Sequence, residues 1–566
     1  MAGGDRRVLL ICTRPGDGRL AALRDSLALD DSADILLPGM ALPDPRGYDA
    51  VVLDGPQDRL DPAEVARLEA FVAAGGTLLA IGAAPGDAQH PVAGLLGARS
   101  DGERPWAEVF GKNAAPTSQL LHRVEPEFAL CDTFAPLRPL NGEARVLLHV
   151  TWALRDEPVA LERRCGEGRV VVSALGNSPE ALQAPALRTL LRRALRQRNG
   201  ARPERTLGIG IVGFGPYSGM GRLHATAARE VDGLRLAAVC DRSPERLAAA
   251  ARELPEVARY ASIKALVRDP AVDVAIVATP PATHATLALE LLRAGKHVVC
   301  EKPLCLTVAE ADALIAAAEQ SEVALTVHQN RRWDPDYLAI RRAVDQGLLG
   351  ELFNVETFVG GFDHPCRLWH SDVAASGGAI YDWGSHFLDW TLLLLPGLPE
   401  LVMANTHKRL WHDVTNADQV RVRLLWDDGR EAEFLHSDLA AIRKPKFYLQ
   451  GTAGTLAGSY RSLVSERVQP GLGYIREEAH FAEAPAELTL ARYESGYGIV
   501  ESRLPLAPAP RFAFHRNLAD HLLLGEPLAV TAESVRRVIA VLEAAHRSAA
   551  QGGRPVRLDA LAPARA

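Results

Sequence analysis

The chain has 566 residues, of which 48% are hydrophobic and 23% charged, and its formal net charge is −7. This composition predicts a water-soluble globular protein of roughly three or four domains, and the negative charge, without a long basic run, argues against nucleic acid as a partner. The longest apolar stretch of note, residues 390–396, is too short to cross a bilayer, and the N-terminus shows no signal peptide, so we expect a cytoplasmic protein without a membrane partner.

Residues 1–200 form the first predicted domain, in which strands and helices alternate. Between two of the strands, Asp61 caps a helix that has Pro62 at its first position and a glycine pair at its end. Apolar runs typical of parallel strands stand at residues 8–12, 50–53 and 77–81. The pattern predicts an α/β domain.

This first domain resembles the ThuA-like family. The resemblance is carried by residues 75–78 (Gly-Gly-Thr-Leu), 158–160, 166–171 and 174–178. It implies a flavodoxin-like or glutamine-amidotransferase-like α/β fold linked to sugar utilisation. Family members often carry histidine where this chain has Asn177, and no elbow-type nucleophile is visible, so a binding or structural role is favoured over catalysis. His122 and Asp132 are polar candidates here, although each fits a surface or locally bonded residue better.

A polar linker at residues 198–205 leads to the second predicted domain, residues 206–330. It opens with a buried-strand signal at residues 209–212. Gly213 and Gly215 follow directly, and they allow a tight turn with a close approach of the backbone to a pyrophosphate.

The third glycine of the usual dinucleotide fingerprint is displaced, so Gly219 or Gly221 must take its place. A helix that begins near Gly221 can direct its N-terminal N–H groups at the phosphates. The next strand ends in Asp241, at the position expected to bind the adenosine ribose hydroxyls. An acid there favours NAD over NADP, but the adjacent Arg242 could pair with a 2′-phosphate, so NADP stays open.

A short apolar strand at residues 298–300 ends in Glu301, Lys302 and Pro303. Proline cannot donate a hydrogen bond to a sheet, so it stops the strand. Lys302 is thereby left at a carboxyl end of the predicted parallel sheet, which is where open α/β folds bind their ligands.

Residues 331–566 read as a third, α+β domain. Alternating runs at residues 418–426 and 431–436 predict strands of a largely antiparallel sheet.

An apolar, helix-like stretch at residues 379–395 of this third domain carries three polar residues. Asp382, His386 and Asp389 share one face at helical spacing. Polar groups on a buried face are costly unless paired, which favours a functional site. The alternative is that His386 only caps or bonds a buried network.

Residues 206–560 resemble the Gfo/Idh/MocA oxidoreductase family, named after glucose-fructose oxidoreductase and inositol dehydrogenase. Four segments carry the resemblance in family order: the glycine loop with His224, residues 278–284, Glu301-Lys302-Pro303, and residues 376–389. It implies a Rossmann domain followed by an α+β domain with a largely antiparallel sheet. The enlarged glycine loop departs from the family pattern in the segment that would contact the phosphates.

The resemblance also implies roles for individual residues. It places Lys302, Asp382 and His386 at the substrate side of the nicotinamide as catalytic residues. The cofactor-binding residues that follow are Gly213, Gly215, Gly219, Gly221, His224, Asp241, Arg242, Thr279, Pro280, His284, Glu301 and Gln329. The expected substrate-binding residues are Arg332, Trp369, His370 and Asp389.

Oxidation of a secondary alcohol needs a hydride acceptor, which the cofactor supplies, and a base within hydrogen-bond reach. Histidine has a reference pKa of about 6.5, which suits this task at neutral pH. The pKa of lysine must be lowered from about 10.4 before the side chain can act as a base. When charged, lysine can stabilise an alkoxide instead. We therefore expect Lys302 and His386 to share proton transfer and alkoxide stabilisation, while Asp382 orients the substrate hydroxyl or the imidazole.

The leading hypothesis is an NAD(P)-dependent dehydrogenase acting on a sugar, glycoside or cyclitol. Two alternatives stay open: a net non-redox cleavage or epimerisation that uses NAD transiently, and a non-catalytic NAD sensor. Seven scattered cysteines without metal-ligand spacing predict reduced thiols and no metal site. A homodimer or homotetramer through the open face of the C-terminal sheet is the expected assembly.

Overall fold

The computed structural model describes residues 7–558 with the exception of residues 14–15, 17, 28, 30–32, 56–59, 83, 116–117, 119, 122–123, 125–126, 141, 143, 197–205, 216–218, 367, 462, 470, 472, 480–483, 508 and 510. The candidate His122 lies outside the described residues. The chain forms two compact units, residues 1–204 and 205–566. Among the residues that the structure describes, no helix is long and apolar enough to cross a membrane.

The first unit is built on a nine-stranded sheet of order β2-β1-β3-β4-β11-β10-β9-β6-β7. Its parallel part comprises β1 (Val8–Cys12), β2 (Asp34–Leu36), β3 (Ala50–Asp54), β4 (Thr77–Ile81) and β11 (Gly168–Ser173). Its antiparallel part comprises β10 (Arg155–Cys165), β9 (Arg145–Trp152), β6 (Arg104–Asn113) and β7 (Glu127–Phe134). The predicted parallel strands are therefore confirmed, and a second, antiparallel half extends the sheet.

Helices and a short ribbon complete the first unit. The helices are α1 (Arg19–Leu27), α2 (Pro62–Ala73), α3 (Pro91–Leu96), α4 (Pro179–Gln183) and α5 (Pro185–Arg196), with a 3-10 turn η1 (Pro45–Gly47). A separate ribbon pairs β5 (Ala98–Ser100) with β8 (Leu137–Pro139). The start of α2 is as the sequence predicts: Asp61 accepts from the Glu64 N–H, and Glu64 accepts from the Asp61 N–H in a capping box.

The second unit begins with a six-stranded parallel sheet of order β14-β13-β12-β15-β16-β17, which is the Rossmann order. The strands are β12 (Leu207–Val212), β13 (Leu234–Cys240), β14 (Ala258–Tyr260), β15 (Val274–Val277), β16 (His297–Cys300) and β17 (Leu325–Val327). The connecting helices are α6 (Met220–Glu230), α7 (Pro244–Glu253), α8 (Ile263–Leu266), η2 (Pro281–Thr283), α9 (His284–Arg293) and α10 (Val308–Gln320).

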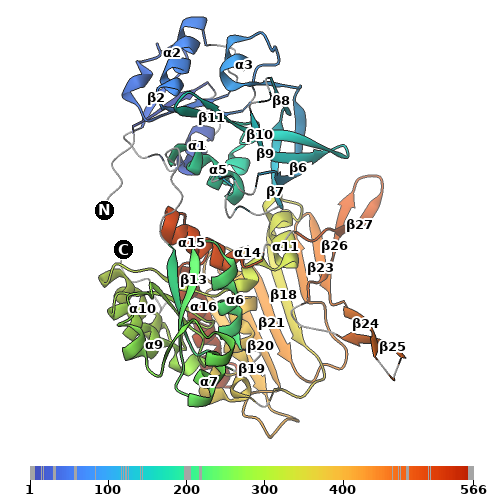
Figure 1. Ribbon diagram of the computed structural model, residues 1–566. Helices are drawn as coiled ribbons and strands as arrows, with labels where there is room; N and C mark the ends of the chain where they lie inside the picture. Colours follow the sequence, from blue (N-terminus) through green and yellow to red (C-terminus); the bar gives the residue numbers. More distant parts are fainter. Residues whose placement is uncertain are drawn as a thin grey trace. The chain divides into compact units, whose positions relative to one another are not determined.

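The rest of this unit carries a nine-stranded sheet of order β27-β26-β23-β22-β18-β21-β20-β19-β28 (Figure 1). It is antiparallel except for the parallel pair β18–β21, so the predicted largely antiparallel sheet is confirmed. Its strands are β18 (Leu352–Gly360), β19 (Leu401–His407), β20 (Gln419–Leu425), β21 (Glu431–Ser437), β22 (Phe447–Gly451), β23 (Gly454–Ser459), β26 (Glu487–Glu494), β27 (Gly498–Leu504) and β28 (Val556–Arg557). A separate hairpin joins β24 (Leu463–Gln469) to β25 (Gly473–Ala479).

The helical segments of this part bring the two sheets together. They are η3 (Asn330–Trp333), α11 (Pro335–Asp345), η4 (Trp369–Ser371), α12 (Val373–Ser376), α13 (Ala379–Asp382), α14 (Gly384–Leu394), α15 (Ala513–Leu524) and α16 (Ala532–Ala550). One continuous hydrophobic core runs from the Rossmann strands to these helices and the second sheet.

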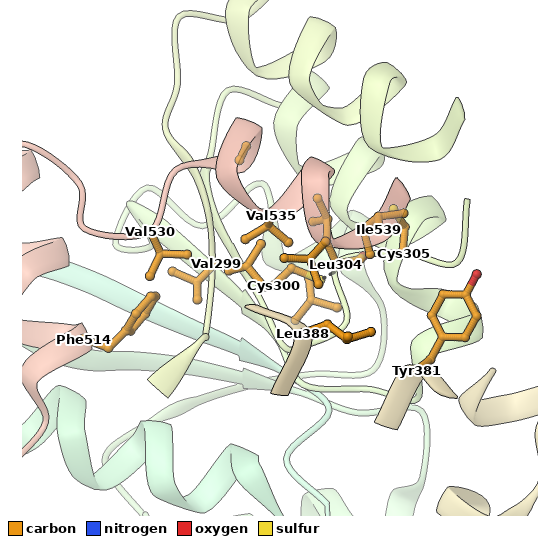
Figure 2. Close-up of a cluster of buried hydrophobic side chains, with 14 of the residues drawn as sticks. Val299, Cys300, Leu304, Cys305, Tyr381, Leu388, Phe514, Val530, Val535 and Ile539 are labelled. Atoms are coloured by element: carbon orange, nitrogen blue, oxygen red, sulfur yellow. Dashed lines mark hydrogen bonds between the residues drawn. The ribbon is translucent and has the colours of Figure 1, made fainter. Parts of the chain in front are cut away.

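The part of this core next to β16 fixes the segment that follows it. Figure 2 shows Val299 and Cys300 of β16 packed among Leu388 of α14 and Val535 of α16. Burial of these apolar side chains anchors the end of β16 against two helices that come much later in the chain. The position of Lys302, two residues beyond the strand, is thereby set by the shared core.

Candidate active site

The glycine loop after β12 is shaped for close contact. Gly213 has φ +91, and a Cβ there would lie 2.7 Å from the Ala278 carbonyl oxygen. A Cβ on Gly221 would lie 2.6 Å from the Phe214 carbonyl oxygen, so a larger residue would move the start of α6 away from β12. Gly215 has φ +69, which also favours glycine.

The first turn of α6 is free to receive an anion. Gly219 is its N-cap, and among the described residues no side chain caps it. Its leading N–H groups are therefore available to phosphate oxygens, which is the arrangement that a dinucleotide requires. The described glycines are compatible with the cofactor: Gly219 begins the helix and Gly221 packs against the strand end, while their contacts with phosphate stay a prediction.

Asp241, the acid that follows β13, lies near Arg246, a residue that the sequence analysis did not select. One oxygen of Asp241 accepts from the Ser243 N–H at 3.0 Å, and the other lies 3.5 Å from Nη1 of Arg246. Arg242, the predicted partner for a 2′-phosphate, is exposed. Arg246 lies in the first turn of α7, close enough in sequence to have been considered.

Glu301 is surrounded by histidines from distant parts of the unit. Its Oε1 accepts from Nε2 of His224 at 2.9 Å and from Nδ1 of His328 at 2.8 Å. Nδ1 of His224 lies 2.8 Å from Nε2 of His515 on α15. Because the carboxylate can only accept, both neighbouring imidazoles donate to it, so neutral His224 accepts from His515.

This arrangement gives His224 and Glu301 a supporting role, and their predicted contacts with the cofactor stay predictions. Both ring nitrogens of His224 bond to protein groups, and one oxygen of Glu301 is shared by two imidazoles. The other oxygen of Glu301 accepts from the Lys302 N–H at 3.2 Å, so the two residues link the start of α6 to the ends of β16 and β17. Burial raises the pKa of Glu301, but the nearby His328 and His224 reverse the effect and hold that pKa well below its usual range.

The three imidazoles of His224, His328 and His515 also lie close enough together to hold a metal ion, since their ligating atoms are within 4.8 Å of one another. No local sequence pattern indicates this cluster, because its members stand on α6, after β17 and on α15. The nitrogen atoms of His224 are engaged in hydrogen bonds within the protein. The absence of a metal therefore stays a prediction.

His284 is a second histidine that braces the site from within. Its ring nitrogens lie 2.7 Å from the carbonyl oxygens of Pro303 and Thr279, and the side chain is fully buried. It links the segment after β16 to the loop after β15. These bonds give His284 a supporting role. The cofactor contacts predicted for His284, Thr279 and Pro280 stay predictions; the Pro280 carbonyl accepts from Thr283 Oγ1 at 2.8 Å.

Lys302 and Asp382 are brought together as the sequence reasoning expected. Nζ of Lys302 donates to Oδ1 of Asp382 at 2.7 Å and to its backbone carbonyl at 3.2 Å. Both side chains are partly exposed, at 20% and 28%. Burial opposes ionisation of Asp382, but the Lys302 ammonium outweighs it and lowers the pKa of the carboxyl.

The imidazole of His386 lies near this pair and has no hydrogen-bond partner among the described residues. The side chain is 4% exposed, and its Nδ1 is buried. Burial, and then the positive charges of Lys302 and Arg331, hold the pKa of His386 well below its usual range. The imidazole is therefore neutral at pH 7 and has a free lone pair.

The helix that carries His386 departs from the prediction. The expected single helix at residues 379–395 is divided into α13 and α14 at Trp383. The Asp382 carbonyl accepts from the Ser385 hydroxyl at 2.8 Å and from Lys302, while the His386 N–H bonds to the Trp383 carbonyl. The break turns the Asp382 backbone toward Lys302.

Arg332 and Asp389, both predicted to bind substrate, are paired with each other. Nε and Nη2 of Arg332 donate to the two oxygens of Asp389 at 2.8 and 2.6 Å. Their side chains are only 8% and 3% exposed. A buried bidentate pair satisfies both charges, which gives these residues a bracing role, and their predicted contact with the substrate stays a prediction.

Several polar atoms around Asp382 have no partner among the described residues. These are Oε1 of Gln329, Nδ1 of His370, Nδ1 of His436 and Oδ1 of Asn416. The charges of His370 and His436 both act on the pKa of Asp382, which places the two imidazoles near the carboxylate. Buried polar groups are nearly always satisfied, so these atoms require water or a polar ligand as their partner.

Of this set, His436 and Asn416 were missed as site residues by the sequence reasoning. His436 lies on an alternating strand, which hinted at an inward side chain, whereas Asn416 precedes β20 in a loop without a recognisable pattern. Its Nδ2 donates to the His370 carbonyl at 2.8 Å. The predicted pair Trp369 and His370 is stacked, with ring centroids 3.7 Å apart.

The N-terminal candidate Asp132 is a structural residue. It is fully buried, and its carboxylate accepts from the backbone N–H groups of Gly176, Asn177 and Ser178 at 2.7 to 3.0 Å. These bonds shape the turn after β11, which supports the interpretation of Asp132 as locally bonded.

Comparison with known proteins agrees with this geometry. Residues 207–329 match an oxidoreductase family with an NAD-binding Rossmann fold, residues 337–457 match the GFO/IDH/MocA C-terminal domain, and residues 42–196 match a family described as trehalose utilisation, ThuA. A scyllo-inositol 2-dehydrogenase (NADP(+)) from Bacillus subtilis is 26% identical over 62% of this chain and 95% of its own length. An inositol 2-dehydrogenase from Rhizobium meliloti is 29% identical over 54% of this chain and 92% of its own length.

Two solved structures are also similar to this chain. An NAD-binding protein from Listeria innocua is 29% identical with a TM-score of 0.54, over 63% of this chain and 98% of that chain. A protein from Klebsiella pneumoniae is 31% identical with a TM-score of 0.51, over 63% of this chain and 96% of that chain. The Rossmann order, the glycine loop and these matches together make the chain a member of the Gfo/Idh/MocA oxidoreductase family that carries an N-terminal ThuA domain.

Proposed function

We propose that this protein oxidises a secondary hydroxyl of a sugar, glycoside or cyclitol, with NAD or NADP as acceptor. The observation that carries the proposal is the Lys302–Asp382 pair beside buried polar atoms that lack protein partners. A polyol supplies hydroxyl groups that satisfy such atoms. The relatives named as inositol dehydrogenases and the N-terminal match to trehalose utilisation favour a carbohydrate.

Different residues accept the hydroxyl proton and stabilise the negative charge that develops on the substrate oxygen. The bound dinucleotide supplies the hydride acceptor, so the chain has to take the hydroxyl proton and stabilise the alkoxide. Neutral His386, with a free lone pair, is the base in this proposal. Lys302, oriented by Asp382, donates to the alkoxide oxygen as its charge develops.

The cofactor preference depends on Asp241. Its carboxylate accepts hydrogen bonds from ribose hydroxyls and repels a 2′-phosphate, so we propose that NAD is preferred. Arg246, 3.5 Å from that carboxylate, and exposed Arg242 leave NADP as a second cofactor.

The two parts of the second unit have different proposed roles. We propose that residues 206–330 bind the cofactor, because they contain the parallel sheet and glycine loop. Residues 331–566 supply the substrate-binding groups and, through the open face of their sheet, the contact of a homodimer or homotetramer.

The test is nicotinamide reduction by the purified full-length protein, with NAD⁺ and NADP⁺ in parallel, across a panel of sugars, glycosides and inositols. We expect Lys302→Met to lower kcat by about 10²- to 10³-fold, the usual effect of removing a donor to a developing oxyanion. Cofactor affinity, measured by fluorescence titration, should stay close to that of the parent protein. Lys264→Met, which changes an exposed lysine on α8, is the matched control.

The outcomes separate the hypotheses. Substrate-dependent reduction that is lost in Lys302→Met and kept in Lys264→Met supports the dehydrogenase. Equal activity of both variants would refute the role of Lys302. A product formed without accumulation of reduced cofactor would favour the transient-redox alternative.

A further inference from the structure

Three aromatic side chains stand on two loops that are joined by hydrogen bonds from the Thr415 and Asn416 N–H groups to the Ser371 carbonyl. These loops also carry polar residues of the set around Asp382, and that set is called the pocket below. Phe362 is 54% exposed and Trp369 38%, while Trp411 is half-buried. Leu368 and Leu410 lie next to these aromatics in the sequence and are also exposed. We call Phe362, Trp369 and Trp411 the outer aromatic face.

This face is continuous with the pocket. Trp369 is stacked on its neighbour His370, whose carbonyl accepts from Nδ2 of Asn416 at 2.8 Å. Nε1 of Trp411 lies 3.4 Å from the Asp438 carbonyl oxygen, and the carboxylate of Asp438 lies 3.3 Å from Nε2 of His436. Trp369 therefore contacts the imidazole of His370 directly, and Trp411 is connected to the imidazole of His436 through Asp438.

The loops that carry the face are held in place by hydrogen bonds. The Thr415 hydroxyl accepts from the Val373 N–H at 2.8 Å, which ties the segment after Trp369 to the segment after Trp411. His364 is stacked edge-on against Trp411 at 4.7 Å and bonds to Asp413 at 3.0 Å. Phe362 contacts Trp411 edge-to-face at 6.2 Å. The aromatic surface is thus preorganised.

The two surfaces differ in what they can bind. The pocket presents imidazole nitrogens, an amide oxygen and the Lys302–Asp382 pair, which suit the hydroxyls of one polyol ring. The outer aromatic face presents ring surfaces that suit a flat or C–H-rich ring and have little to offer hydroxyl groups. A free monosaccharide or cyclitol would use the pocket and leave the face exposed.

From this juxtaposition we infer that the substrate is a glycoside whose glycone ring occupies the pocket and whose aglycone, an aromatic ring, lies on the outer aromatic face. The inference rests on the proposed carbohydrate oxidation and narrows its substrate class. Binding of the aglycone would also fix the glycone against Lys302 and His386, since remote binding energy can be used to orient the reacting group.

The experiment compares the methyl and phenyl glycosides of each sugar that the full-length protein oxidises. The parent protein should show a higher kcat/KM for the phenyl glycoside. In Phe362→Ala the ratio of the two kcat/KM values should fall by about tenfold or more, the scale of losing an apolar contact in a specificity pocket. Tyr497→Ala, which removes an aromatic side chain that is 86% exposed in the β26–β27 turn, should leave the ratio unchanged.

A parent protein without preference for the phenyl glycoside, or a preference that survives in Phe362→Ala, would overturn the inference. If no sugar is oxidised at all, the proposed function fails, and quenching of tryptophan fluorescence by phenyl glycoside tests the face by itself. Quenching that is weakened in Phe362→Ala supports the aglycone site, and equal quenching refutes it. A change of oligomeric state in Phe362→Ala with an unaltered substrate ratio would assign the face to a second copy of the chain.

Discussion

Replacement of Arg332 by methionine tests whether this residue supports the fold or binds the substrate. Its guanidinium donates two hydrogen bonds to Asp389, one to the Ala529 carbonyl at 2.8 Å and one to the Ser534 hydroxyl at 3.1 Å. These contacts join η3 to α14 and to the start of α16. Methionine keeps much of the side-chain volume and removes all four donors.

The expected cost follows from the burial of the pair. With Arg332 removed, the Asp389 carboxylate stays in a site where it is 3% exposed, without its counter-charge. Breaking a buried pair in this way costs about 3–5 kcal/mol, which is roughly 10²- to 10³-fold or more in the unfolding equilibrium. The double variant Arg332→Met/Asp389→Leu should regain most of this loss, because it leaves no unpaired charge.

The assay is urea unfolding of the full-length protein followed by tryptophan fluorescence, for which buried Trp390 on α14 is a local reporter. Arg341→Met is the control, because its pair with Asp345 is 44% and 59% exposed and should contribute only about 0–1 kcal/mol. The bracing role would be refuted if Arg332→Met had the parent stability and only its KM for the sugar increased.

Three further predictions concern pH and the cofactor. Burial holds the pKa of His386 and His515 well below the usual value of about 6.5, so below that pH the unfolded chain binds more protons than the folded chain. The free energy of unfolding should therefore fall as the pH drops from about 6.5 toward 5. A higher free energy of unfolding at about pH 5 in urea denaturation would contradict this. Gly221→Ala should weaken cofactor binding about tenfold or more in fluorescence titrations, because its Cβ would meet the Phe214 carbonyl oxygen, whereas Gly94→Ala should not. Asp241→Ser should raise the kcat/KM ratio of NADP to NAD by about tenfold, since it removes a charge that repels the 2′-phosphate; an unchanged ratio would disprove that role.

Local sequence patterns were sufficient for the backbone framework. The glycines after β12 follow from their conformational freedom, and the strand before Lys302 ends where a proline cannot pair. Apolar runs of the right length predicted both the parallel sheet and β20–β21. Such features depend on a few consecutive residues, so a single sequence is enough to recognise them.

The partners of the charged side chains were decided by tertiary structure alone. Arg332 and Asp389 carried the residue types of a sugar site, yet burial makes each the counter-ion of the other. His224 and His515 are 291 positions apart and share a hydrogen bond, which no local pattern could indicate. The break at Trp383 likewise depends on Lys302 competing for the Asp382 carbonyl. Spacing places polar residues on a face, but only the packed fold determines which of them satisfy one another and which stay available to a substrate.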